Sequence, residues 1–207
     1  VNHSVASSEE NEAIYTTQID DSVASWIDKS MITLDIAMYN LNRPVIQDAI
    51  NDAYDRGVQV RYIAEGGNAN IGLDYLNLNI PVLERENATS SGMHNKFMII
   101  DADSTENAWI MGGSTNFSSN MIDDPNNMIF IQDQSLARAY RVEFEEMWGS
   151  SNEIPSTSAR FADSKLDNTS HIFNIAGRNV ELYFSPSDGT ESKISSAILS
   201  ADSSIYF

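Results

Sequence analysis

The stretch His94-Asn95-Lys96-Phe97-Met98-Ile99-Ile100-Asp101, followed by Gly112-Gly113-Ser114-Thr115-Asn116, decides how the rest of the sequence is interpreted. Residues 97–100 form a short apolar run, which is typical of a buried strand. Side chains alternate along a strand, so His94 and Lys96 are expected on one face and Asp101 on the other. We therefore expect Asp101 to orient its neighbours at the strand end rather than to touch a substrate.

These side chains suit the hydrolysis of a phosphodiester. A neutral imidazole at His94 can attack phosphorus and form a covalent intermediate that water later resolves. The Lys96 ammonium can neutralise charge on the non-bridging oxygens, while Ser114 and Asn116 offer uncharged donors to the same oxygens. Such a site requires no metal ion and no cofactor, but a second group must protonate the leaving oxygen. The alternative is a purely structural His94.

The surrounding pattern predicts an α/β domain. A strand, a helix and a second strand follow one another before the motif, an order that favours a parallel sheet covered by helices. More strands follow on the motif, so we expect a mixed β-sheet with helices on both faces. The expected strands are residues 31–39, 58–62, 94–101, 107–111 and 127–131, and the expected helices are a short one capped by Asp20 or Asp21, one from Pro44 to Gly57, a short one at 71–79 and one at 134–148.

Composition divides the chain into three parts. Residues 1–150 form the domain that carries the motif, and the polar stretch 151–177 is interpreted as a connector. From 178 to 207 the pattern restarts with a strand at 180–184, a helix with Ile194 and Ile198 on one face, and a strand beginning at Ser204. We interpret this as the start of a second, truncated unit. The residues up to about Thr17 are expected to be a loosely ordered lead-in.

The charge balance restricts the possible partners. The formal net charge is −18 and the pI is near 4.2, so any anionic partner must be held by a local basic group. The sequence has no cysteine and no apolar run long enough to span a bilayer. Its first residues show neither the basic nor the apolar region of a signal peptide, so none is expected within the given sequence, as in a mature secreted protein. A soluble protein that is secreted or periplasmic is expected. The acidic turn at residues 103–106 is interpreted as a solvated turn rather than a calcium site.

The motifs H-x-K-x4-D and G-S-x-N resemble those of the phospholipase D superfamily. The resemblance runs from about Tyr15 to Trp148 and implies a phospholipase D-like half-domain. It implies that His94 is the nucleophile or its acid–base partner, that Lys96, Ser114 and Asn116 bind phosphate, and that Asp101 supports the site. Many nuclease-like relatives have a Glu that orients the histidine where this chain has Asn126. An amide can accept a hydrogen bond from the imidazole but supplies no charge.

The resemblance also implies a site built from two such motifs, whereas this sequence has one. The second half-site is expected from a C-terminal domain or from a homodimer, and a single half-site is expected to be inactive without it. The favoured function is a metal-independent phosphodiesterase that acts on phospholipid head groups through a phosphohistidine. The alternatives are a nuclease of the same superfamily acting on DNA or RNA, and a noncatalytic binding or assembly half of a larger protein.

Overall fold

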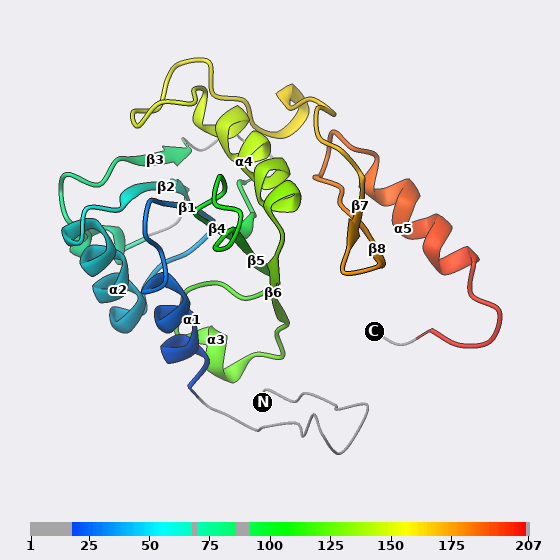
Figure 1. The fold of residues 1–207 in the computed structure, drawn as a ribbon, viewed down its shortest axis with the longest axis horizontal. Helices are drawn as coiled ribbons and strands as arrows, with labels where there is room; N and C mark the ends of the chain where they lie inside the picture. The colour runs from blue at the N-terminus through cyan, green and yellow to red at the C-terminus, as the bar shows by residue number, and fades with distance from the viewer. Residues whose placement is uncertain (1–17, 68–69, 86–91, 206–207) are drawn as a thin grey trace.

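The computed structural model describes residues 18–67, 70–85 and 92–205, so the expected lead-in up to Thr17 lies outside the described residues. Most of the chain forms one α/β domain, and a smaller arm follows it (Figure 1). The elements are α1 (Ile19–Ile27), β1 (Thr33–Met38), α2 (Pro44–Asp55), β2 (Gln59–Glu65), the 3-10 helix η2 (Leu73–Tyr75), β3 (Val82–Arg85), β4 (Lys96–Ile100), β5 (Trp109–Gly113), α3 (Asn120–Asp123), β6 (Met128–Gln132), α4 (Gln134–Trp148), the 3-10 helix η3 (Ala162–Ser164), β7 (Ile172–Ile175), β8 (Arg178–Glu181) and α5 (Thr190–Leu199).

The main sheet is mixed, with strand order β3-β2-β1-β4-β5-β6. β1, β2 and β3 run parallel to one another, and β4 joins antiparallel to β1. β4, β5 and β6 then form an antiparallel meander. This arrangement confirms the predicted mixed sheet. Strand β3 was not predicted, because four residues of mixed polarity give too short a pattern to distinguish from a loop.

Helices cover both faces of the sheet. On one face α1 and α2 pack against alternate residues of β1, namely Leu34, Ile36 and Met38. On the other face α4 packs through Phe144 and Trp148, together with its other buried apolar residues. Figure 1 shows these helices on opposite sides of the strands. Apolar side chains thus line both faces of the central strands, which explains why their sequences are continuous apolar runs.

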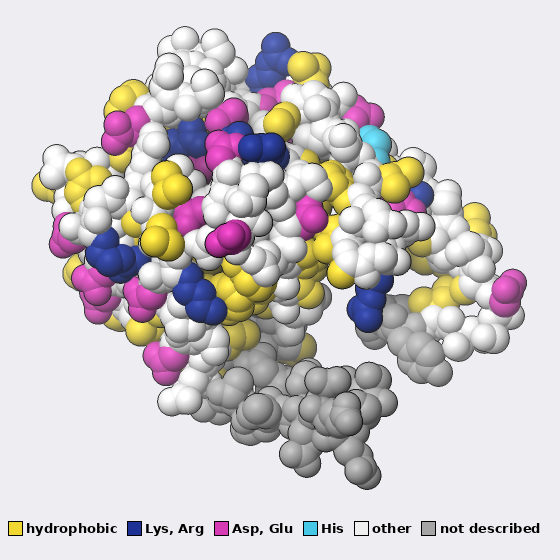
Figure 2. Space-filling model, in the orientation of Figure 1, with side chains coloured by type: hydrophobic (Ala, Val, Ile, Leu, Met, Phe, Trp, Pro, Cys, Tyr) yellow, Lys and Arg dark blue, Asp and Glu magenta, His cyan; other side chains and the backbone are white. Residues whose placement is uncertain are grey.

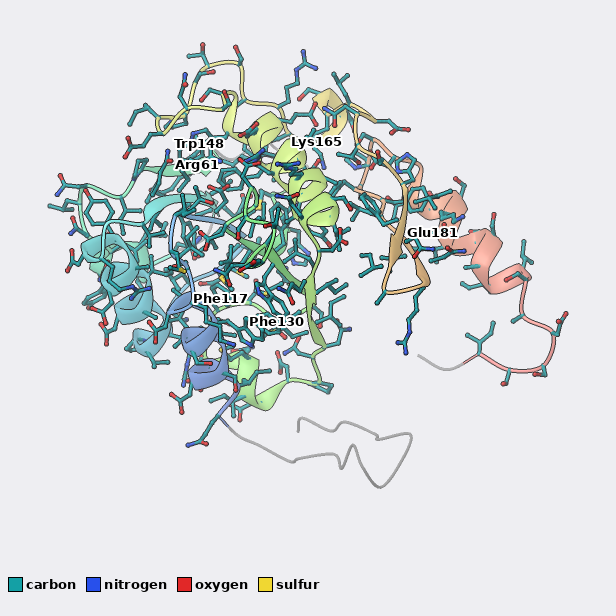
Figure 3. All side chains as sticks on the ribbon, viewed as in Figure 1. Arg61, Phe117, Phe130, Trp148, Lys165 and Glu181 are labelled. Atoms are coloured by element: carbon teal, nitrogen blue, oxygen red, sulfur yellow. The ribbon has the colours of Figure 1, made fainter. Side chains whose placement is uncertain are left out.

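A buried ion pair lies between the sheet and α4. Arg61 donates to both carboxylate oxygens of Asp35 at 2.7 and 2.8 Å, and both residues are almost fully buried. The Arg61 guanidinium lies 4.9 Å from the ring centroid of Phe144, and Figure 3 shows Arg61 close to Trp148. Because a buried charge is tolerated when it is paired and hydrogen-bonded, Asp35 and Arg61 can occupy an otherwise apolar layer.

The beginning of the domain differs from the prediction in one detail. Gln18 occupies the N-cap position of α1, whereas Asp20 lies inside the first turn. Asp20 is buried and forms an ion pair with Arg43, the residue just before α2. An acidic residue in the first turn still complements the helix dipole. Asp20 therefore links α1 to the start of α2 instead of capping its own helix.

The residues after α4 form a connector and an arm. The predicted connector contains an unpredicted strand, β7, which pairs with β8 in a two-stranded antiparallel sheet. Phe173, Leu182 and Phe184 attach this hairpin to the α4 side of the domain. Helix α5 extends beyond it and has no buried residue. The strand predicted from Ser204 is not present at Ser204 and Ile205, and its last two residues lie outside the described ones.

The surface matches the acidic composition. Figure 2 shows Asp and Glu side chains spread over the visible face, with a few Lys and Arg between them, and hydrophobic side chains in the notch between the domain and the arm. Asp103 at the acidic turn forms ion pairs with Arg138 and Arg141 of α4. Within the described residues, no helix is both long and apolar enough to cross a membrane.

Candidate active site

One edge of the main sheet collects the candidate residues. The pairing registers place the C-terminal ends of β1, β2, β3 and β5 beside the N-terminal ends of β4 and β6. Residues distant in sequence therefore meet along a single line of strand ends. In the order of the strands across the sheet these residues are Arg85, Glu65, Tyr39, His94 with Lys96, Ser114 and Asn126.

His94 is exposed and stands just before β4 rather than within it. Its ring packs edge-on against Tyr39, with ring centroids 4.8 Å apart. Partial burial and the nearby charge of Lys96 lower the pKa of His94 below its ordinary value of 6.5, while the charge of Glu65 opposes the shift. The imidazole is therefore mostly neutral at pH 7. A neutral, accessible imidazole is the state that a nucleophile requires.

Lys96 begins β4 and is 91% buried, with 9% of its surface exposed. Its ammonium donates to the carbonyl oxygen of His94 at 3.0 Å and lies 5.1 Å from the ring centroid of Tyr39. Burial lowers the pKa of Lys96 from 10.5 to about 8. Burial leaves the Lys96 ammonium poorly solvated. A bound anion would therefore stabilise this charge more than it would stabilise a fully solvated lysine.

Ser114 and Asn126 form a small polar network at the far end of the line. The Ser114 hydroxyl donates to Oδ1 of Asn126 at 3.1 Å and accepts from the backbone N–H of Asn127 at 3.0 Å. Adding a Cβ atom to Gly113 would place it 2.2 Å from the Asn127 carbonyl oxygen, so the close approach of β5 to β6 requires glycine there. Among the interactions of the described residues, Asn126 contacts Ser114 rather than His94.

Asn116 lines a small polar cavity next to these residues. The cavity has a volume of about 170 Å³, and its lining includes Asn40, Asn116 and Asn126. The side-chain oxygens of Asn40 and Asn116 are buried and have no hydrogen-bond partner among the described residues. Unsatisfied amide groups of this kind are expected to bind water or a polar ligand. The structure thus brings Asn116 and Asn126 to the same cavity.

Asp101 is not part of this edge, although the motif groups it with His94 and Lys96. It follows the other end of β4, so about seven residues of chain, roughly 20 Å, separate it from His94. Its carboxylate accepts the backbone N–H groups of Met31, Ile32 and Thr33 at 2.7 to 3.0 Å. Asp101 therefore fixes the entry into β1, and its distance from His94 excludes direct contact with the same small substrate.

Tyr39 and Glu65 are the residues that sequence reasoning missed. Tyr39 packs against both His94 and Lys96, and its backbone N–H donates to the carbonyl oxygen of Asn95 at 3.0 Å. Glu65 is 4% exposed and accepts the backbone N–H groups of Met93 and Gly67, so it holds the segment that precedes His94. Neither residue belongs to a motif, because both reach the site through strand register alone.

A mixed sheet that presents His94 and Lys96 at the head of a central strand, with a G-S-x-N turn on the next strand, defines a phospholipase D-like domain. The comparisons agree, since the family described as "Cardiolipin synthase, PLD-like domain" matches residues 23–148. The chain belongs to this phospholipase D-like family of phosphodiesterases.

Individual relatives show the same relationship. The mitochondrial cardiolipin hydrolase of Chlamydomonas reinhardtii is 28% identical over 121 residues, which cover 56% of this chain and 51% of that protein. The corresponding protein of Drosophila melanogaster is 27% identical over 147 residues, which cover 61% and 57%. The chain therefore spans only about half the length of these relatives.

Two solved structures have the same fold. Nuc from Salmonella typhimurium, a phospholipase D family member, superposes with a TM-score of 0.53 at 22% identity, covering 63% of this chain and 86% of that one. NucT from Helicobacter pylori gives a TM-score of 0.51 at 23% identity, covering 65% and 90%. At this level of identity the likeness concerns the fold.

Proposed function

We propose that this chain supplies one half of a metal-independent phosphodiesterase site that acts on phospholipid head groups. The observation that carries the proposal is the pairing of an exposed imidazole at His94 with the buried ammonium of Lys96. The lowered pKa of His94 keeps the nucleophile neutral, and Lys96 offers its charge to the phosphate.

In the proposed reaction an imidazole nitrogen of His94 attacks phosphorus, and the bond from phosphorus to the leaving alcohol oxygen breaks. The leaving oxygen takes a proton from an acid on a second half-site, which a second copy of the chain or a further domain would supply. Water then attacks the phosphohistidine and gives a phosphate monoester and a free imidazole. Ser114 and Asn116 are proposed to orient the phosphate, and Asn126 to hold the Ser114 hydroxyl.

The two alternative functions, a nuclease and a noncatalytic binding or assembly half, would require different features of the molecule. A nuclease needs several cations along the path of a nucleic acid, whereas this chain has a net charge of −18. A noncatalytic half would not need a neutral, accessible His94 beside a buried lysine. The secreted or periplasmic location stays a proposal that rests on the acidic composition.

The test is hydrolysis of bis-p-nitrophenyl phosphate and of short-chain phospholipids with EDTA present. The wild type is compared with His94→Ala, and with His171→Ala as a matched control, since His171 lies on the arm and pairs with Asp167. The proposal expects turnover that His94→Ala abolishes and His171→Ala leaves unchanged, with a substrate-derived phosphoryl adduct on His94 after rapid denaturation at alkaline pH, where the phosphorus–nitrogen bond survives. Mixing His94→Ala with Lys96→Ala protein tests whether a second copy completes the site. Equal turnover by wild type and His94→Ala would refute the proposal.

A further inference from the structure

A second cavity adjoins His94 on the side away from Ser114. It has a volume of about 480 Å³, within the range of small-molecule sites. One wall comes from the sheet edge, through Arg85, Met93 and His94. The opposite wall comes from the segment after α4, through Phe161, Lys165 and Pro186, together with other residues. The nucleophile candidate therefore stands at the border of a half-open cavity whose lining does not include Lys96, Ser114 or Asn116.

Arg85 is the unusual residue of this cavity. It ends β3 with 8% of its surface exposed, and its guanidinium lies 5.2 Å from the ring centroid of Phe161. No carboxylate pairs with it within the described part of the chain. Its neighbour in β2, Glu65, uses its carboxylate oxygens on the backbone N–H groups of Met93 and Gly67. A buried guanidinium without an anion is costly, and a bound anion would remove that cost.

The other cation of the cavity is already neutralised. The Lys165 ammonium lies 2.5 Å from the carboxylate of Glu143, which is 1% exposed, and donates to the Ser185 carbonyl oxygen at 2.8 Å. Asp163 is exposed and can remain solvated at the rim. Among its described lining residues, the cavity thus holds one cation that is free to bind a ligand, in a molecule whose overall charge repels anions at long range.

We propose that Arg85 forms a second anion-binding subsite, which takes a phosphate monoester carried by the leaving alcohol of a phospholipid head group. This assignment rests on the proposed function, because it places the scissile phosphate at His94 and Lys96. Arginine binds phosphate through two parallel hydrogen bonds, and it repels a quaternary ammonium. The wall has an apolar part that includes Met93, Met147 and Phe161, and its described residues offer a single free cation. Both features favour a lipid head group over a nucleic acid.

Binding of glycerol 3-phosphate, measured by calorimetry at low salt, tests the subsite without requiring turnover. We expect Arg85→Gln to weaken binding about 10- to 100-fold, and Arg85→Lys to recover part of it. Arg160→Gln is the matched control, because Arg160 lies outside this cavity and pairs with Glu146, and it should bind as the wild type does. Lys96→Met should retain binding.

The outcomes separate this inference from the proposed function. Loss of binding in Lys96→Met but not in Arg85→Gln would place the ligand at the scissile-phosphate site and overturn the subsite. Absence of binding to the wild type, or displacement of the ligand by a short single-stranded oligonucleotide, would also overturn it. In either case hydrolysis that depends on His94 would still stand.

Selectivity between substrates gives a kinetic readout that a purely structural Arg85 would not change. Wild type should prefer a short-chain lipid with a glycerophosphate leaving group over one with choline. Arg85→Gln should remove that preference, whereas the control Arg160→Gln should keep it. Equal preference in both proteins would refute the assignment. If Arg85→Gln does not fold, NMR spectroscopy of the wild type gives the test. The Nε–H resonance of Arg85, which is assigned by its absence in Arg85→Lys, must then shift when glycerol 3-phosphate is added.

Discussion

Lys96→Met is expected to make the protein more stable at pH 7 while abolishing hydrolysis. Burial lowers the pKa of Lys96 from 10.5 to about 8, so the folded state binds the proton less tightly than the unfolded state does. At about 1.4 kcal/mol per pH unit, that difference is an unfavourable free energy of about 3 kcal/mol at neutral pH. Methionine has a similar length and no charge. Its net gain is about 2 kcal/mol, after about 1 kcal/mol is subtracted for the lost hydrogen bond to the His94 carbonyl.

The sign of the pH dependence follows from the same difference. Below pH 8 Lys96 is protonated in both states and the full penalty applies, whereas above pH 8 the folded state releases its proton first and the wild type gains stability. The penalty falls to about 1.4 kcal/mol at pH 9.5, so the advantage of Lys96→Met should shrink by roughly 2 kcal/mol between pH 7 and 9.5. Urea denaturation of both proteins at the two pH values measures this.

The matched control is Lys29→Met. Lys29 is exposed and packs against the Trp26 ring, so its charge carries no burial penalty that the substitution could remove. A Lys96→Met protein that is less stable than the wild type at pH 7, with the same difference at pH 9.5, would refute the reasoning. That result would mean that Lys96 is stabilised as a cation in the folded protein.

Lys96, Asp101 and Gly113 give three further expectations. The alkaline limb of kcat/KM for phosphodiester hydrolysis should lie near pH 8 and disappear in any Lys96→Arg protein that remains active; an unchanged limb would exclude Lys96 as its origin. Asp101→Asn should cost about 2 to 3 kcal/mol of unfolding free energy in urea, because its amide would face the N–H donor of Met31, and a loss below 0.5 kcal/mol (about the scatter of surface changes) would contradict this. Gly113→Ala should lower the melting temperature by several degrees, because the added Cβ would collide with the Asn127 carbonyl oxygen. Gly57→Ala is the comparison, since its Cβ would meet no atom and any loss of stability there measures backbone strain alone.

The sequence was sufficient to predict those parts of the fold that repeat a regular pattern. The long helices α2 and α4 and the apolar strands β1, β4, β5 and β6 fall close to their predicted ranges. Asp101 was expected at the strand end, and it follows β4 at the end opposite His94. By contrast, β3 and β7 have four residues each, and β7 lies in a polar stretch, so neither gives a periodic signal.

The candidate site was predictable where a motif supplies its residues and unpredictable where the sheet does. His94, Lys96, Ser114 and Asn116 could be named from their spacing. Tyr39, Glu65 and Arg85 each end a different strand, and only the strand order β3-β2-β1-β4 brings them beside His94. Strand order depends on long-range pairing, which a single sequence does not specify. The roles of all these residues in catalysis remain predictions.

Helix α5 has ten residues, none of them buried, and Ile194, Ile198 and Leu199 remain exposed to solvent. An isolated helix of that length is marginal in water, so its stability depends on whatever covers it. In the free chain its amide protons should exchange with solvent almost as fast as those of an unstructured peptide. Amide exchange in α5 therefore reports on binding at the end of the arm. Slower exchange there would show that another surface packs on α5, whether or not any substrate is hydrolysed.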